Sequence, residues 1–408
     1  MRVRIIVAGA VTAAAVVLCA SGVTWQVRRT QAESAARWPT PADEPPIDVL
    51  PLRPTDDGWR ALEPLLADID REVEEDLREA IMTPGPLIDP GGWVAVADQL
   101  DGLDEALVHP TITSPGIETF DDPFPELGEV LSLGRALCLR GWTSFESGMY
   151  TEAIDDMLAT DLLGRRIAAG GQTVISVMTG VALQDIALTE LDELLAVIPD
   201  PEAHAHAAAG LAVERSASRV RDVLLRECIM FEQVFSQFET NPALLTQTAG
   251  PDGEVSEPGI AAQLNRFRYD HDATVAQLRQ NCRREHDRLA LPSGERGERA
   301  PLVPQGAEGE LYNQIGCALL GMGGPDYGVM VDRELRAQLH RDGLRLLTAA
   351  RRHALAHDGQ LPASSAVLVG TYLPGPVIDS FTGAPLEIVG GVIQTSQLER
   401  EWTVTVPE

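Results

Sequence analysis

The stretch GWTSFESGMYTEAIDDM, residues 141–157, has the pattern of two helices joined by a short turn. Gly141 lacks a side chain, so a second helix can approach its backbone closely. Gly148 and Tyr150 fall at the turn, and Ala153 offers a small side chain where the second helix packs on the first. The sequence therefore predicts a helical hairpin at this point of the chain.

The helical pattern continues in both directions from this hairpin. Apolar residues recur at three- and four-residue steps from Trp59 to Val73, and Asp89-Pro90 is a typical helix start. Ala and Leu are abundant and aromatic residues are few, which favours helix over sheet. We expect helices at about 56–82, 89–108, 124–147, 150–168, 172–198, 201–239, 260–290, 310–321 and 326–357, with loops at 109–123, 246–259 and 291–309.

The N-terminal segment from Ile5 to Trp25 contains no charged residue. As a helix it would span about 30 Å, which is the thickness of a bilayer core. We expect a membrane anchor; a signal peptide cleaved near Ala20 and a lipoprotein site at Cys19 are the alternatives. Arginines flank the segment on both sides, so its orientation stays open.

The predicted fold class is mainly α, with stacked antiparallel helix pairs similar to a helical repeat. Residues 30–55 are rich in Pro, Ala and acidic side chains, as linkers often are. The predicted organisation is a transmembrane anchor or signal segment (1–29), a linker (30–55), a helical domain (56–357) and a small C-terminal α+β module packed on the last long helix (358–408).

The composition excludes several functional classes. The formal net charge of −29 argues against binding of nucleic acid, whose phosphates need a basic surface. All 32 basic residues are Arg. Without Lys, the chain cannot form a P-loop, the strand Lys of a kinase, a pyridoxal phosphate Schiff base or the S-x-x-K motif of penicillin-binding enzymes.

The cysteines offer one candidate disulfide. Cys19 lies in the apolar segment, which leaves Cys138, Cys228, Cys282 and Cys317. Cys228 and Cys282 lie on the two helices that flank the loop 246–259, and their mean position falls inside that loop. If a bridge forms in an oxidising compartment, we favour Cys228–Cys282, with Cys138 and Cys317 as buried thiols or a second bridge. The other interpretation is that all four cysteines are small buried hydrophobic residues.

The C-terminal stretch HDGQLPASSAVLVGTYLPGPVIDSFTGAPL, residues 357–386, is dominated by apolar and turn-forming residues. Gly359 is expected to end a helix, and Asp379 to accept backbone N–H groups of the following turn. Gly383 permits a positive φ, and Pro385 stiffens the entry to a strand. We expect a structural role for this turn set: Gly359, Pro362, Asp379, Phe381, Gly383 and Pro385.

Two resemblances follow from these motifs. The hairpin at 141–157 resembles about half of one tetratricopeptide (TPR) repeat, a fold that implies a peptide-binding groove. The C-terminal stretch resembles the G-x-x-P…YLP…DPF-G-PL module of uncharacterised membrane-anchored bacterial envelope proteins, and is distantly similar to type II secretion pseudopilins. The chain lacks the N-terminal cleavage motif of pseudopilins and has no acidic residue before Glu33.

No residue is singled out as catalytic, cofactor-binding or metal-binding. His353 and His357 are four apart, as metal ligands can be, but the Glu of H-E-x-x-H is missing; His204 and His206 fall on different helix faces. We expect a non-catalytic scaffold of the cell envelope without a cofactor, anchored through residues 5–25, whose acidic helical surface binds another envelope protein. The alternatives are an envelope hydrolase using carboxylates and an accessory part of a type II secretion-like apparatus.

Overall fold

The structure is a computed structural model. It describes residues 33, 35–40, 42, 44–47, 53–72, 100, 102–115, 127–212, 219–240, 269–305, 313, 317, 319–320, 326–395 and 402–404. The predicted anchor at 5–25 lies outside the described residues, as does the loop 246–259.

Within these residues the protein is mainly helical and carries a small three-stranded sheet near its C-terminus. The chain divides into two compact units. The larger, called the helical unit, comprises residues 50–227, 288–297 and 326–408. The smaller, called the disulfide unit, comprises residues 1–49, 228–287 and 298–325.

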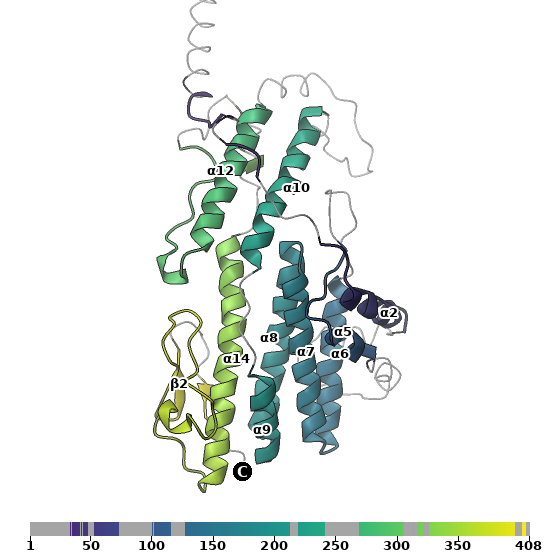
Figure 1. Cartoon of the computed structure of the whole chain (residues 1–408), viewed down its shortest axis with the longest axis vertical. Coiled ribbons are helices and arrows are strands. Elements are labelled where there is room, and N and C mark those ends of the chain that lie inside the picture. Colours follow the sequence, from purple (N-terminus) through teal and green to yellow (C-terminus); the bar gives the residue numbers. More distant parts are fainter. Residues whose placement is uncertain are drawn as a thin grey trace, which may run out of the picture. The chain divides into compact units, whose positions relative to one another are not determined.

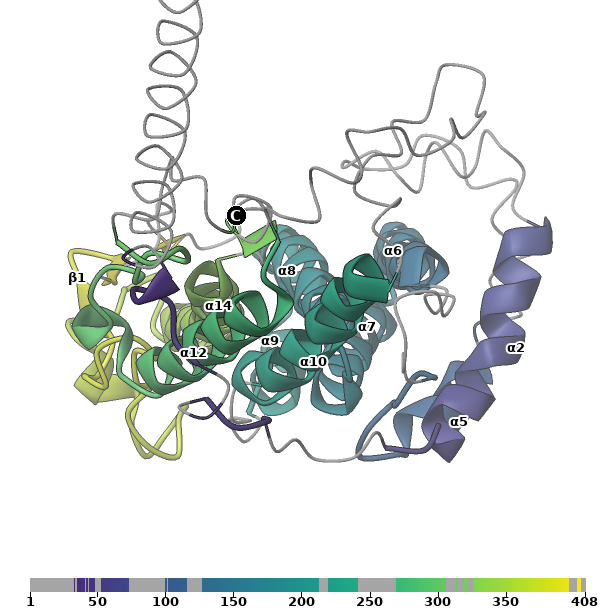
Figure 2. The same cartoon turned by 90° about the horizontal axis from the view of Figure 1, so that it is seen from above.

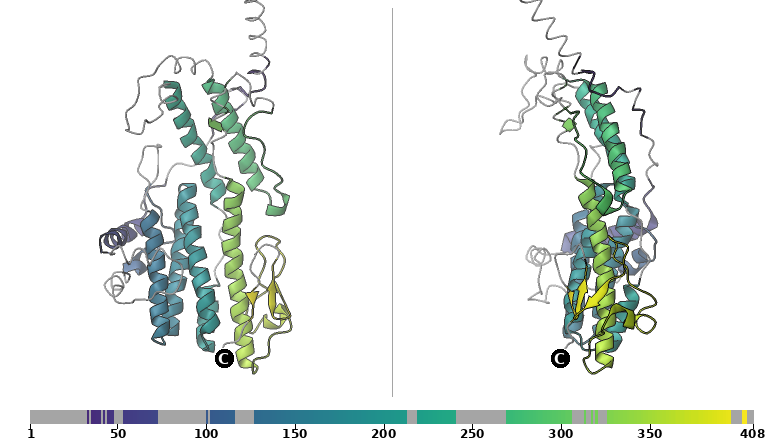
Figure 3. Two further views of the ribbon diagram at one scale, coloured as in Figure 1. Left: turned by 180° about the vertical axis from the view of Figure 1, so that it is seen from behind. Right: turned by 90° about the vertical axis from the view of Figure 1, so that its left-hand side faces the viewer.

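The helical unit is built around five long or medium helices that lie side by side (Figure 1, Figure 3). They are α6 (Leu127–Glu146), α7 (Tyr150–Gly170), α8 (Val174–Val197), α9 (Pro201–Gly210) and α14 (Tyr327–Ala356). The shorter α2 (Asp57–Glu72) and α5 (Leu103–Leu107) belong to the same unit, and Figure 2 shows them beyond the end of the row formed by α14, α8, α7 and α6.

Glycines set the close spacing of these helices. Gly148 has a φ of 78° at the turn between α6 and α7, a conformation that other residues rarely adopt. A Cβ on Gly141 would lie 2.9 Å from the carbonyl oxygen of Ala153. Between α7 and α8, a Cβ on Gly164 would lie 2.5 Å from the carbonyl oxygen of Gly180. The helix backbones can therefore approach only because these positions have no side chain.

Helix α8 is the centre of the helical unit. Among the described residues it is the one helix long and apolar enough to cross a membrane, judged by length and composition. Most of that apolar stretch is buried inside the protein, including Leu183, Leu188 and Leu194, which are fully buried. The core helix of a folded domain has the same composition, because its side chains face neighbours on all sides.

The C-terminal module is held on α14 by an apolar contact and a set of tight turns. Gly359 (φ 82°) ends the helix, and its N–H donates to the Ala354 carbonyl at 2.8 Å. Asp379 accepts the backbone N–H groups of Phe381 at 2.7 Å and Thr382 at 3.2 Å. Leu386 is buried in the same apolar cluster as the α14 leucines, and Phe381 packs against that cluster.

Three short antiparallel strands follow in the order β1-β2-β3. They are β1 (Glu387–Val389), β2 (Val392–Gln394) and β3 (Trp402–Thr403), preceded by the 3-10 turn η4 (Ser365–Leu368). Trp402 is 3% exposed and stacks on His340 of α14 with ring centroids 5.6 Å apart. A Cβ on Gly343 would lie 2.2 Å from the Trp402 ring, so this glycine makes room for β3 to dock.

The disulfide unit contains most of α10 (Val220–Thr240) and α12 (His271–Leu289). Asp270 begins α12, because its carboxylate accepts the N–H of Ala273 at 2.9 Å. Asn313 is buried with a φ of 50°, and its side-chain oxygen accepts the Asp270 N–H at 2.9 Å. The two residues fix where the helix starts.

Several predicted boundaries are wrong. The single helix expected at 201–239 is two helices, because α9 ends at Gly210 and α10 begins at Val220. Of the helix expected at 260–290, Tyr269 and Asp270 are not helical, since the Asp270 cap starts the helix at His271. Of the helix expected at 89–108, the described part is helical mainly at Leu103–Leu107.

Candidate functional site

The helical unit contains a buried group of charged and polar side chains, called the charged seam. It consists of Asp161 on α7, Gln184 on α8 and Arg341 on α14. The side chains of Arg341 and Asp161 are 2% and 1% exposed. The Arg341 Nε donates to Asp161 at 3.2 Å, a terminal guanidinium nitrogen donates to the other carboxylate oxygen, and the same nitrogen donates to Gln184 at 3.0 Å. Three helices are thereby joined at one point.

Asp161 and Arg341 each have a further hydrogen-bond partner besides one another and Gln184. Arg165 donates from its Nε to Asp161 at 3.0 Å, so the carboxylate receives two arginines. Arg341 also donates to the side chain of Gln338 at 3.1 Å. Both carboxylate oxygens of Asp161 therefore already accept guanidinium N–H groups, which leaves them poorly placed to contact a substrate. The seam is therefore suited to fixing helix register rather than to acid–base catalysis.

A second buried polar group lies at the α8–α9 junction. His204 is fully buried, and its Nε2 lies 3.0 Å from the carbonyl oxygen of Ile198. A carbonyl oxygen can only accept, so this nitrogen carries the proton. Burial lowers the pKa of His204 to about 4, with nearby Arg351 acting in the same direction. The imidazole is therefore neutral at pH 7.

The hairpin itself carries a charged pair and a protected thiol. Arg140 donates to both carboxylate oxygens of Asp156, at 3.1 Å from Nε, which ties α6 to α7. Burial raises the pKa of the Cys138 thiol to about 12, and its sulfur lies 3.8 Å from the Thr160 hydroxyl. Because the thiolate is the reactive form of cysteine, Cys138 is chemically inert at neutral pH.

Among the described residues of the helical unit, three carboxyl groups have a raised pKa, the property expected of a catalytic acid. Loss of hydration raises the pKa of Asp185 to about 6, and raises the pKa of Glu190 and Glu227 as well. Glu190 accepts the indole N–H of Trp142 at 2.8 Å. Each carboxyl faces different partners, so these three do not form the converging acid pair that the hydrolase alternative requires.

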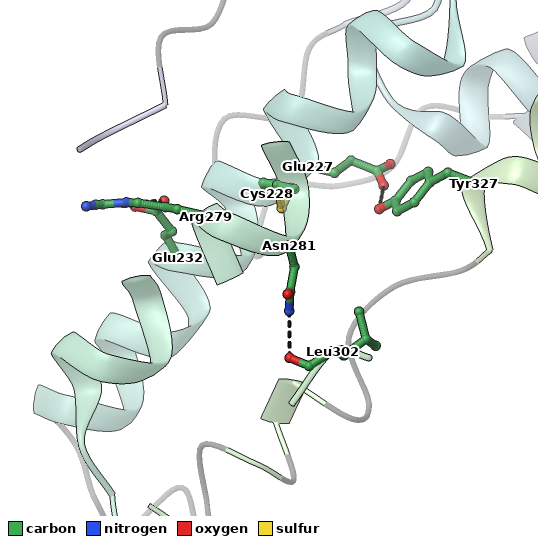
Figure 4. Close-up of a disulfide and its surroundings, with 8 residues drawn as sticks. Glu227, Cys228, Glu232, Arg279, Asn281, Leu302 and Tyr327 are labelled. Atoms are coloured by element: carbon green, nitrogen blue, oxygen red, sulfur yellow. Dashed lines mark hydrogen bonds and ion pairs between the residues drawn. A yellow bond between two sulfur atoms is a disulfide. The ribbon is translucent and has the colours of Figure 1, made fainter. Parts of the chain in front are cut away.

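The other two carboxyl groups with a raised pKa, Glu227 and Asp185, have different neighbours. Glu227 accepts the backbone N–H of Val174 at 2.8 Å and the hydroxyl of Tyr327 at 2.9 Å (Figure 4). Asp185 lies near Arg333 and Arg336, which oppose the rise of its pKa. Across the described part of the chain there is also no group of three or more His, Cys, Asp or Glu side chains placed to hold a metal ion.

The disulfide unit is organised around a Cys228–Cys282 bridge between α10 and α12, the pairing favoured from the sequence. The Cα atoms are 6.5 Å apart, and the two residues are 2% and 5% exposed. Arg279 donates to both oxygens of Glu232, each at 2.8 Å, and Asn281 donates to the Leu302 carbonyl at 2.7 Å (Figure 4). The bridge is thus buried between two helices that polar contacts also align.

Part of the predicted linker is docked on this unit, in a segment called the strap (residues 44–47). Arg279 donates to the Glu44 carbonyl at 3.2 Å, and Arg283 pairs with the Glu44 carboxylate. Arg283 also donates to the Pro46 carbonyl at 3.2 Å, and Ile47 is 8% exposed. The strap therefore makes specific contacts with α12, which composition alone does not reveal.

Sequence reasoning missed the charged seam, although a signal for it exists. On α14 the positions Ala337, Arg341, Leu344, Thr348 and Arg351 follow steps of four and three residues, so two arginines lie on the apolar stripe of the helix. All five are buried. A charge in such a stripe needs an opposite charge on a facing helix, and Asp161 lies on the corresponding stripe of α7.

The comparisons with known proteins add no relative to this description. Protein-family models, curated proteins and solved structures were compared with the chain, and none of them matches it.

Proposed function

We propose that this protein is a membrane-anchored scaffold of the bacterial cell envelope, whose domain lies outside the cytoplasm and binds another envelope protein without catalysing a reaction. The observation that carries the proposal is the buried Cys228–Cys282 disulfide. Structural disulfides persist in oxidising compartments and are rare where thiols are kept reduced. The bridge therefore supports export of the domain.

The strap supports attachment close to the membrane. Glu44 and Pro46 are held by Arg279 and Arg283 of α12. The segment expected to anchor the chain ends at Trp25, so only a short stretch separates it from the strap. Such a connection would hold the disulfide unit near the bilayer rather than on a long free tether.

Exposed apolar side chains support a protein-binding role. Four large ones in the C-terminal module are together called the apolar surface and are Leu361, Val367, Val369 and Val389. Val389 and Val367 are 53% and 49% exposed. The Ser365 hydroxyl donates to Glu387 at 2.7 Å, which joins η4, where Val367 lies, to β1, where Val389 lies. Groups of exposed apolar residues often mark protein-binding sites.

The first experiment asks where the domain lies. Cells making the native full-length protein are quenched with acid, and free thiols are counted from the gel shift caused by a maleimide-polyethylene glycol reagent. We expect two thiols, Cys228 and Cys282, to become reactive only after reduction, and the protein to pellet with membranes and resist carbonate extraction. A chain that starts at Thr30, made in the cytoplasm, is the matched control and should be fully reactive.

The second experiment asks whether the apolar surface binds a protein. A photo-crosslinking amino acid is placed at Val367 and, as a control, at Val108 of the helical unit, which is 75% exposed. We expect one discrete crosslinked product from position 367 in intact envelopes. In the first experiment, thiol labelling of Cys228 and Cys282 without reduction would contradict export of the domain. In the second, equal crosslinking from positions 367 and 108 would contradict only the proposed binding role.

A further inference from the structure

The end of α14 carries a pair of histidines that the proposed function does not use. His353 lies in the last turn of the helix, and His357 is its C-terminal cap residue. Their rings are stacked, with centroids 4.1 Å apart and planes within 10° of parallel. The spacing of four residues brings both side chains to one face of the helix.

Hydrogen bonds fix which ring nitrogens are free. The Nδ1 of His353 lies 3.2 Å from the carbonyl oxygen of Gln360, and the Nδ1 of His357 lies 2.8 Å from that of His353. Since carbonyl oxygens only accept, both Nδ1 atoms donate. In the neutral rings the lone pair is therefore on each Nε2, and this arrangement is typical of metal-ligating histidines, whose other nitrogen donates to a backbone carbonyl.

Charges of both signs lie near the two histidines. The C-terminal end of a helix carries a partial negative charge, and α14 is 30 residues long. Asp358 follows directly in sequence, and the chain has a net charge of −29. The Tyr372 ring lies edge-on to His353 at 5.8 Å, and the Arg352 guanidinium, whose positive charge opposes a bound cation, lies over the Tyr372 ring at 5.4 Å.

We infer that His353 and His357 form a two-histidine binding site for a divalent transition-metal ion of the kind that prefers imidazole, such as Zn²⁺, Ni²⁺ or Cu²⁺. Each Nε2 would bind at about 2.0–2.1 Å for zinc, with water completing the coordination. A metal lies in the plane of each imidazole that binds it, so the stacked rings must tilt toward each other on binding. The inference is independent of the scaffold role.

The test uses untagged full-length protein, because a polyhistidine tag would bind the same ions. Titration calorimetry with Ni²⁺ or Zn²⁺ and electron paramagnetic resonance with Cu²⁺ are performed on the wild type, His353→Gln, His357→Gln and His206→Gln. His206 is the matched control, because it is also partly exposed and pairs with Asp155 rather than with a second histidine.

We expect one strong site per chain, with nitrogen hyperfine splitting in the Cu²⁺ spectrum. Either His353→Gln or His357→Gln should weaken binding at least about 10-fold, whereas His206→Gln should leave it unchanged. Unfolding curves measured without metal establish that each variant folds. Equal affinity in the wild type and the His357→Gln variant, or no binding by the folded wild type, would overturn the inference.

Discussion

In the helical unit, α7, α8 and α14 enclose charged side chains inside a leucine-rich core, whereas in the disulfide unit α10 and α12 are joined by a covalent bond. Neither large cluster of buried apolar side chains includes a described residue of α10 or α12. Besides Leu278, α12 buries Ala273, Val275 and Ala276, which cover less apolar surface than leucine does. The ion pair of Glu232 and Arg279 is 17% and 16% exposed. A pair of helices with a thin apolar contact needs a cross-link, while a thick core tolerates a buried ion pair.

Removing one partner of the charged seam should have the largest effect. We expect Arg341→Met to lower the free energy of unfolding by about 3–5 kcal/mol, because the buried Asp161 carboxylate keeps only the partly exposed Arg165 as a counter-charge. Guanidinium chloride unfolding followed by circular dichroism measures the change. Arg60→Ala is the control, since Arg60 and Asp57 form a surface pair with side chains 65% and 73% exposed, and its loss should cost about 0.5 kcal/mol or less.

The double variant Asp161→Leu/Arg341→Met sharpens this result. Replacing both charges by apolar groups of similar size removes the uncompensated charge, so most of the lost stability should return. Asp161→Leu alone completes the cycle, and a stability loss in the double variant equal to the sum of the two single losses would show that the two side chains do not act as a pair.

Removing the Cys228–Cys282 bridge should lower the stability of the disulfide unit by about as much as Arg341→Met lowers that of the helical unit. The bridge closes a loop with a sequence separation of 54 residues. Loop-closure entropy for that length corresponds to about 4 kcal/mol at 25 °C, although strain and residual structure often reduce the effect. We expect Cys228→Ala/Cys282→Ala to remove hydrogen-exchange protection from α10 and α12, while α7 and α8 stay protected. Equal loss of protection in both units would contradict their separate stabilisation.

Acid should weaken the helical unit through His204. Its pKa is lowered to about 4 by burial, against about 6.5 in an unfolded chain. Between these values the unfolded chain binds more protons, so stability is full above about pH 6.5 and is lost as the pH falls toward 4. The shift corresponds to about 3 kcal/mol at most. His204→Gln should make the free energy of unfolding depend less on pH between pH 4 and 6.5. His357→Gln, at the exposed end of α14, is the control and should keep the wild-type dependence. The same slope in the wild type and both variants would contradict the assignment to His204.

The sequence was sufficient where local rules decide the structure. Periodicity predicted α7, α8 and α14 closely, and the position of Gly359 predicted the end of α14. It failed at the break after Gly210, which interrupts a run of alanines that has high helix propensity. It also failed where long-range contacts decide, because the start of α12 depends on Asn313, a residue 43 positions away from Asp270. The charged seam depends on partners 180 residues apart, Asp161 and Arg341, which single-helix patterns cannot pair.

The smallest expected effect concerns the docking of β3 on α14. Gly343→Ala would place a Cβ 2.2 Å from the Trp402 ring, so the ring or the strand must move. We expect a loss of about 1–3 kcal/mol, the usual cost of overpacking a core, and faster hydrogen exchange in β2, which pairs with β3.

Gly128→Ala of α6 is the matched control for that substitution. A Cβ there meets nothing within 4 Å, so replacing this glycine in the first turn of α6 should stabilise by up to about 0.5–1 kcal/mol. The two substitutions add the same methyl group to the same unit, and their opposite signs separate packing from helix propensity. Stabilisation of both variants would contradict the close packing of the Trp402 ring against Gly343. It would leave the pairing with β2 as the contact that holds β3.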